Sequence, residues 1–119
     1  MTGLFSRLFG TAGSQPRWID PADLQRRQAA GAVLLIDVRQ PEEYASPPGH
    51  LPGAINVPVG EIGSRATDLG DRGQPIVVVC KTDRRSARAA GELLAAGLRD
   101  VAVLRGGTDR WHADGLPLE

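Results

Sequence analysis

Short apolar runs alternate with amphipathic segments along the chain. Three of these runs are almost continuous and rich in β-branched residues, at 33–38, 75–80 and 101–104. Such runs are typical of strands that are buried on both faces of a parallel sheet. A shorter run at Ala54–Val57 predicts one more strand, within a stretch that prolines and glycines otherwise break.

Helix signals lie between the apolar runs. Asp20 followed by Pro21 offers an N-cap and a favoured first helical residue, which predicts a helix to about Ala30. The alanine- and leucine-rich stretch 84–96 predicts the longest helix, with Gly97 as its left-handed C-terminal cap. Shorter helices are expected at 41–44, 59–69 and 108–113.

Strands that alternate with helices predict an α/β fold, with a parallel sheet covered on both faces. The longest helix should pack on that sheet through the face that carries Ala87, Gly91, Leu94 and Leu98. In such sheets, ligands bind beyond the carboxyl ends of the strands. Cys80 ends the second long apolar run and therefore lies at such a position.

The length of 119 residues fits one domain, which we expect to span residues 17–119. Residues 1–16 would form an N-terminal extension. This extension is either flexible or a short amphipathic helix, because its apolar side chains between positions 4 and 9 follow helical spacing. Arg7 and Gly10 interrupt its apolar residues, so no membrane span is expected.

Fourteen basic residues balance fourteen acidic ones, which removes the broad positive field typical of nucleic-acid binding. Nucleic acid is therefore not an expected partner. One cysteine cannot form an internal disulfide, and with two histidines the chain lacks the ligands of a typical structural zinc site. We expect no metal, no other cofactor, and a reducing compartment, the cytoplasm, as the location.

The segment 80–86 joins a buried strand to the longest helix, which makes Cys80 a candidate nucleophile. A tight loop would aim successive backbone N–H groups at the sulfur, and a helix N-terminus adds about half a positive charge. Both features favour a thiolate over a thiol. Three cations against one carboxylate give the segment a formal charge of +2, which would attract a small anionic substrate. The alternative is that Cys80 is a small, buried hydrophobic residue.

Several segments, taken in their order, resemble the rhodanese family. They are Leu35–Arg39, Glu42–Tyr44, Gly49–Pro58, Ile76–Cys80 with Arg85–Ser86, and Leu104–Gly107 with Trp111 and Leu116–Pro117. The resemblance runs from about Trp18 to Pro117, and the joint order and spacing are specific to the family. It implies a rhodanese-like fold with a mostly parallel central sheet of about five strands, flanked by helices on both faces.

The resemblance implies a single-domain sulfurtransferase. In this family a cysteine accepts the outer sulfur of a donor such as thiosulfate and holds it as a persulfide. The sulfur then passes to cyanide, to a small-molecule thiol, or to the thiol of a partner protein in a sulfur relay. By position, Cys80 is the catalytic residue. The substrate-binding loop would consist of Lys81, Thr82, Asp83, Arg84, Arg85 and Ser86, with the last two bracing its end.

Four further residues allow more than one interpretation. Asp83 stands where many family loops have glycine; aspartate tolerates a left-handed backbone, and its charge near the sulfur would weaken binding of a dianionic donor. Asp37 and Arg39 match a pair that organises the family's site, or they form an exposed ion pair worth about 0 to 1 kcal/mol. We interpret His50 as a packing residue, because an amide cradle already activates the cysteine without a Cys-His dyad.

Two other functions compete with sulfur transfer. A cysteine phosphatase also holds a thiolate in an amide cradle, but its Cys-x5-Arg motif needs arginine where Ser86 stands, and Arg85 comes one residue early. A non-enzymatic persulfide carrier or regulatory partner-binding module would use the same fold. The presence of Cys80 argues against an inactive module and leaves a carrier open.

Overall fold

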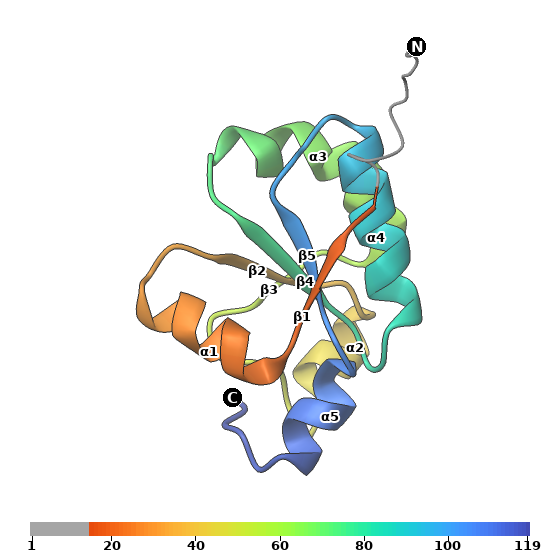
Figure 1. Ribbon diagram of the computed structural model, residues 1–119. Helices are drawn as coiled ribbons and strands as arrows, with labels where there is room; N and C mark the ends of the chain where they lie inside the picture. The colour runs from red at the N-terminus through yellow and green to blue at the C-terminus, as the bar shows by residue number, and fades with distance from the viewer. Residues whose placement is uncertain (1–14) are drawn as a thin grey trace.

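The computed structural model describes residues 15–119. Five strands form one sheet in which all neighbours run parallel, in the order β1-β5-β4-β2-β3 (Figure 1). The strands are β1 (Arg17–Ile19), β2 (Leu34–Asp37), β3 (Ile55–Asn56), β4 (Ile76–Val79) and β5 (Val101–Leu104). The expected α/β fold with about five mostly parallel strands is therefore confirmed.

The apolar pattern does not indicate strand β1. Arg17 and Trp18 are exposed, and of its three residues Ile19 alone is buried. The strand forms through backbone pairing with β5, where Arg17 stands opposite Ala102 at the edge of the sheet. The N-terminal extension 1–16, expected to be flexible or a short amphipathic helix, lies almost wholly outside the described residues.

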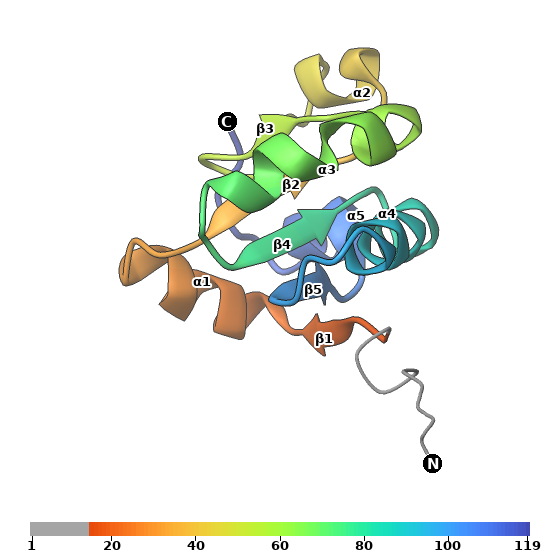
Figure 2. The same cartoon turned by 90° about the horizontal axis from the view of Figure 1, so that it is seen from above.

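Helices cover both faces of the sheet. They are α1 (Pro21–Ala29), α2 (Pro41–Ala45), the 3-10 turn η2 (Val59–Glu61), α3 (Ile62–Asp71), α4 (Arg84–Ala95) and α5 (Gly107–Ala113). Helices α3 and α4 pack on one face, and α1 and α5 on the other (Figures 1 and 2). Within residues 15–119, no helix combines the length and apolar character needed to cross a bilayer.

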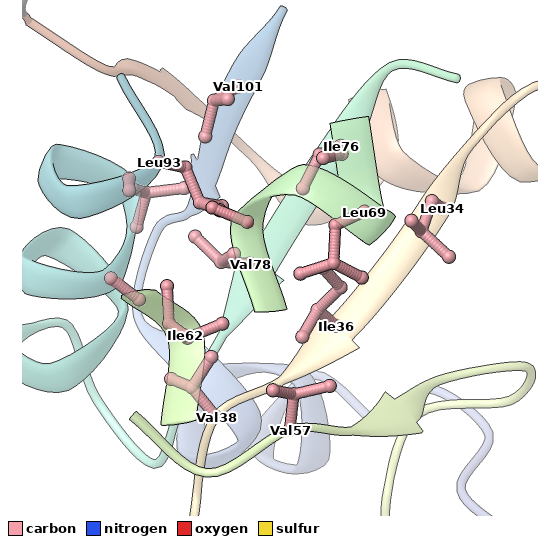
Figure 3. Packing of buried hydrophobic residues seen from close by; sticks show 14 of the residues in the cluster. Leu34, Ile36, Val38, Val57, Ile62, Leu69, Ile76, Val78, Leu93 and Val101 are labelled. Atoms are coloured by element: carbon pink, nitrogen blue, oxygen red, sulfur yellow. The ribbon is translucent and has the colours of Figure 1, made fainter. Parts of the chain in front are cut away.

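The core has one apolar layer on each side of the sheet, because successive strand residues point to opposite faces. Ile36 and Val78 meet Leu69 of α3 and Leu93 of α4 on one side (Figure 3). On the other side, Val77 belongs to the cluster that contains residues of α1 and α5. Full burial of each large aliphatic side chain contributes about 1.5–3 kcal/mol. Burial on both faces explains why the central strands are continuous apolar runs.

Helix α4 contacts the sheet through a face displaced by about one residue from the expected one. Its buried residues are Ser86, Ala89, Ala90 and Leu93. The predicted residues Ala87, Gly91, Leu94 and Leu98 are only half-buried. Small side chains on both sides of this helix leave the hydrophobic pattern ambiguous, so the sequence does not identify which face is buried.

The carboxyl ends of the central strands lie side by side. The Val38 N–H donates to the Val79 carbonyl at 2.9 Å, immediately after β2 and before Cys80. The Arg105 N–H donates to the Ile19 carbonyl at 2.9 Å, just after β5. The segments that follow β2, β4 and β5 therefore lie beside one another at the carboxyl ends of the strands. Cys80 directly follows β4, the middle strand of the sheet.

Candidate active site

The candidate nucleophile lies at the start of the loop that joins β4 to α4. Cys80 follows the last residue of β4, is 1% exposed, and is the single free cysteine. Only three residues separate it from Arg84, where α4 begins. The chain must therefore turn sharply around the sulfur.

Ser86 provides the direct polar contacts of the Cys80 sulfur. Its backbone N–H donates to Sγ at 3.3 Å, and its hydroxyl Oγ lies 3.2 Å from Sγ. The same hydroxyl donates to the Asp83 carbonyl at 3.1 Å. Because a hydroxyl has one proton, it can serve either this carbonyl or a thiolate sulfur. Ser86 is fully buried, so these contacts are shielded from water.

The loop backbone is held from outside by the N-terminus of α5. The Thr108 N–H donates to the Cys80 carbonyl at 2.8 Å, and the Asp109 N–H donates to the Lys81 carbonyl at 3.0 Å. A Cβ atom added to Gly107 would stand 2.4 Å from the carbonyl oxygens of Cys80, Lys81 and Thr82. All three carbonyls therefore point at Gly107.

This orientation determines where the loop N–H groups point. In a trans peptide the N–H is directed opposite to the preceding C=O. Since the carbonyls of 80–82 face α5, the N–H groups of Lys81, Thr82 and Asp83 face away from α5. The loop thus presents three successive N–H donors on its far side, while the N–H that donates to Sγ itself is that of Ser86.

Arg85 is bound to a carboxylate in a distant segment. Its Nη1 and Nη2 donate to the two carboxylate oxygens of Glu43 in α2, at 2.6 and 3.0 Å. This hydrogen bond lowers the pKa of Glu43 to about 2 and raises the pKa of Arg85. Arg85, which was expected to brace the end of the loop, is thus held in place by the carboxylate of Glu43.

The other loop side chains are also largely engaged. Lys81 Nζ lies 2.9 and 2.8 Å from the carboxylate oxygens of Asp109. Asp83 accepts a hydrogen bond from the Gly106 N–H at 2.8 Å, so its carboxylate is tied to the turn after β5. Thr82 and Arg84 are exposed.

Asp83 does not take the left-handed backbone that its place in the loop suggested. Its φ is −138° and its ψ is −24°, so the loop closes without a positive φ at this position. A residue other than glycine is accommodated here because no left-handed geometry is needed.

Asp37 and Arg39 form a buried pair, and the interpretation of an exposed ion pair was wrong. Arg39 Nε lies 3.0 and 3.1 Å from the two oxygens of Asp37, and Arg39 Nη2 donates to the Gly49 carbonyl at 3.1 Å. Asn56 donates to the carbonyls of both members, at 3.0 and 2.9 Å. This network fixes the segment after β2 beside the loop.

His50 packs against Tyr44. The two rings stack with centroids 3.8 Å apart, and His50 Nδ1 lies 3.0 Å from the Tyr44 carbonyl oxygen. The other ring nitrogen, Nε2, lies 3.7 Å from the carboxylate of Glu119. Both ring nitrogens thus face partners other than Cys80, which fits the packing role.

A cavity of about 620 Å³ flanks the loop between α2 and α5. Lys81 and Thr108 form its side next to the loop, and Glu42, Glu43 and His112 are among its other lining residues. Pro47 and Pro48 complete part of the wall. Among residues 15–119, no group of three or more His, Cys, Asp or Glu side chains is arranged to hold a metal ion.

Sequence reasoning missed Glu43, Gly107 and Asp109 as partners of the loop. Glu43 and Gly107 lie within the segments that resemble the rhodanese family, which was the available signal. No local pattern marks Asp109, which is one of several acidic residues on short helices.

The family model described as "Rhodanese-like domain" matches residues 20–114. The chain is 35% identical over 101 residues to a sulfurtransferase of Allochromatium vinosum, covering 84% of this chain and 92% of that protein. It is 40% identical over 116 residues to the HTH-type transcriptional regulator Rv0324 of Mycobacterium tuberculosis, covering 90% of this chain but 46% of the regulator.

The fold is similar to that of a thiosulfate sulfurtransferase from Pseudomonas aeruginosa, with a TM-score of 0.77 and 30% identity. That match covers 87% of this chain and 20% of the larger protein. The likeness to sulfurtransferases supports a sulfur-transfer role for the domain.

Proposed function

Because this chain belongs to the rhodanese-like domain family, we propose that it is a sulfurtransferase that carries sulfane sulfur as a persulfide on Cys80. A donor such as thiosulfate would supply the sulfur. Cyanide, or the thiol of a protein or small molecule, would take it away. The expected location remains the cytoplasm.

The observation that carries this proposal is the environment of the Cys80 sulfur. Sγ accepts the Ser86 N–H at 3.3 Å, and the loop directs the N–H groups of 81–83 away from α5. Donors of this kind favour a thiolate and, after transfer, the anionic outer sulfur of a persulfide. A purely structural cysteine would need neither feature.

The reaction would proceed in two displacements. First, the Cys80 thiolate attacks the outer sulfur of thiosulfate; a new S–S bond forms, the donor S–S bond breaks, and sulfite leaves with the electron pair. Second, cyanide attacks the outer sulfur of the persulfide, thiocyanate forms, and the Cys80 thiolate is restored. The loop N–H groups would hold the negative charge in both states.

The remaining predicted site residues would act through the loop. Arg85 and Glu43 anchor the start of α4, and the backbone of 81–83 supplies donors. Lys81 is tied to Asp109 of α5, and Asp83 is tied to the Gly106 N–H in the turn after β5. We assign these residues to loop positioning and Cys80 alone to covalent chemistry.

A second candidate is a persulfide carrier that works within a larger assembly. It is favoured by the match to Rv0324, where the corresponding stretch is less than half of a transcriptional regulator. Turnover separates the two functions, because a carrier would load sulfur on Cys80 and release it slowly to small acceptors. A phosphatase is disfavoured because Arg85 is bound to Glu43 and Ser86 occupies the sixth position after Cys80.

Intact-mass spectrometry tests the proposal. Reduced protein incubated with excess thiosulfate should gain the mass of one sulfur atom on Cys80, and cyanide should remove it as thiocyanate. The Cys80→Ala variant is the control. An unchanged wild-type mass, or the same adduct on Cys80→Ala, would overturn the assignment.

A further inference from the structure

Another cavity, of about 630 Å³, lies at the amino ends of β4 and β5, whereas Cys80 lies at the carboxyl end of β4. It is bounded by the end of α3, the turn that leads into β4, and the segment between α4 and β5. Its apolar lining includes Leu98, which packs against the core, and Ile76, the first residue of β4. A volume of this size lies in the range of pockets that take organic groups.

The electrostatics of this cavity favour a cation. Its ionisable lining residues are Asp71, Arg99 and Asp100, and Arg17 pairs with Asp100, so these side-chain charges cancel. Helices α3 and α4 both end at the cavity, and each helix C-terminus adds about half a negative charge. Asp71 has no basic partner within residues 15–119, and Arg72, which follows it, does not line the cavity.

The chain enters the described domain beside this cavity. Arg17, the first residue of β1, forms an ion pair with Asp100 of the cavity lining and stands opposite Ala102 of β5. Figure 1 shows the start of β1 near the segment between α4 and β5. The residues that precede Arg17 are therefore joined to the domain at the edge of the cavity.

Residues 1–14 lie outside the described residues, and their sequence has the chemistry that the cavity fits. Arg7 is their one ionisable side chain, and they contain no carboxylate side chain. Their large apolar residues recur at helical spacing on both sides of Arg7, at Leu4, Phe5, Leu8 and Phe9. Such a segment offers apolar surface together with one positive charge.

The connection is long enough for this segment to enter the cavity. Residues 10–16 contain no large apolar side chain and include two glycines, a composition typical of a linker. Phe9 precedes Arg17 by eight residues, which extend to at most about 26 Å. A short linker gives a tethered segment an effective concentration on the order of mM, so even weak affinity is sufficient for docking.

From these observations we infer that the cavity between the ends of α3 and α4 is a docking site for residues 4–9 of the same chain. The phenylalanine and leucine side chains bury apolar surface against Leu98, and the Arg7 guanidinium faces Asp71 and the two helix C-termini. This inference is independent of the proposed chemistry of Cys80, which lies at the other end of β4.

Paramagnetic broadening of backbone amide signals in NMR spectra tests the inference. A nitroxide is attached to Thr2→Cys in the whole chain, in a Cys80→Ala background that leaves one thiol. Position 2 lies fifteen residues before Arg17, so the linker alone does not hold the label at the cavity. Amide signals of residues 66–76 and 96–100 should lose intensity, while those of α2 should keep it.

Variants of the segment separate docking from proximity. Phe5→Ser combined with Phe9→Ser removes most of the apolar surface, and the broadening at the cavity should then be lost. Ser6→Ala is the matched control, because it changes a residue of the same segment that is not one of the large apolar side chains. It should keep the broadening of the unmodified segment.

Variants of the cavity test the charge. Asp71→Lys places a cation where Arg7 docks and should weaken docking about fivefold, measured as the loss of broadening. Asp68→Lys makes the same change on α3 outside the cavity lining and should have a smaller effect. Equal effects of the two variants would overturn the role of Asp71.

A mixed sample identifies which chain supplies the segment. It contains spin-labelled chains without isotope and isotope-labelled chains without a nitroxide. Broadening at the cavity in this mixture, as strong as in the single sample, would show exchange between copies and overturn docking within one chain. The inference would also fail if the wild-type segment and the Phe5→Ser, Phe9→Ser segment broadened the cavity signals equally, or if neither broadened them.

Discussion

Replacement of Gly107 by alanine should separate loop orientation from general stability. The new Cβ would stand 2.4 Å from three carbonyl oxygens of the Cys80 loop, well inside van der Waals contact. These neighbours are backbone atoms, so either α5 or the loop must move. Two hydrogen bonds, of 2.8 and 3.0 Å, join α5 to these same peptides and would be stretched.

The magnitude follows from two contributions. Gly107 has a φ of +61°, which costs an alanine about 1–2 kcal/mol. Weakening two backbone hydrogen bonds adds about 1 kcal/mol each. We expect a loss of about 3–4 kcal/mol in the free energy of unfolding. Displacement of the loop N–H groups by about 1 Å should lower the sulfur-loading rate by about 100-fold.

Gly115→Ala is the matched control. Gly115 follows the same helix, has a φ of +75°, and has open space where a Cβ would stand. It should lose about 1–2 kcal/mol and keep its loading rate. Urea unfolding gives the stabilities, and intact-mass kinetics at a temperature where both variants are folded gives the rates. A Gly107→Ala protein that loads sulfur at the wild-type rate would refute the role of α5 in orienting the loop.

Three further predictions concern the contacts of the loop. Both Arg85→Ala and Arg85→Lys should load sulfur more slowly and unfold about 1 kcal/mol more easily, because neither keeps the two-pronged bond to Glu43; wild-type rates in either would contradict this. Ser86→Ala keeps its N–H but loses the hydroxyl 3.2 Å from the sulfur, so stopped-flow loading should slow about fivefold, equivalent to about 1 kcal/mol. The pKa of Glu43 is lowered to about 2 in the folded protein, so this pair stabilises the fold above about pH 4.5 and the stabilisation is lost as pH falls toward 2. Urea unfolding of wild type and Glu43→Gln should therefore differ at about pH 7 and converge at about pH 2; a constant difference would show that the pair is not the cause.

The layered α/β fold and the place of Cys80 can both be predicted from the pattern of residues along the chain. Apolar runs such as 75–80 are continuous because the strands are covered on both faces. A run without polar residues therefore predicts a strand that is buried on both faces. The carboxyl end of such a strand, followed by a helix, fixes where a reactive side chain stands. The resemblance of separate segments added the family, and the match over residues 20–114 confirms it.

Local patterns did not predict strand β1 or the buried face of helix α4, because the residues of both segments fit more than one arrangement. Strand β1 has one buried residue and forms because its N–H and C=O groups pair with β5. Helix α4 carries small residues on several faces, so the pattern alone did not identify Ser86, Ala89, Ala90 and Leu93 as its buried face.

The partners of the loop were decided by tertiary structure alone. Glu43 is 42 residues from Arg85, and Asp109 is 28 residues from Lys81. No periodicity relates positions so far apart. From the sequence alone, each carboxylate is interpreted as an ordinary surface charge on a short helix. Only the packing of α2 and α5 around the end of β4 brings these charges together, and it gives Lys81 and Arg85, two of the three loop cations, a carboxylate partner each.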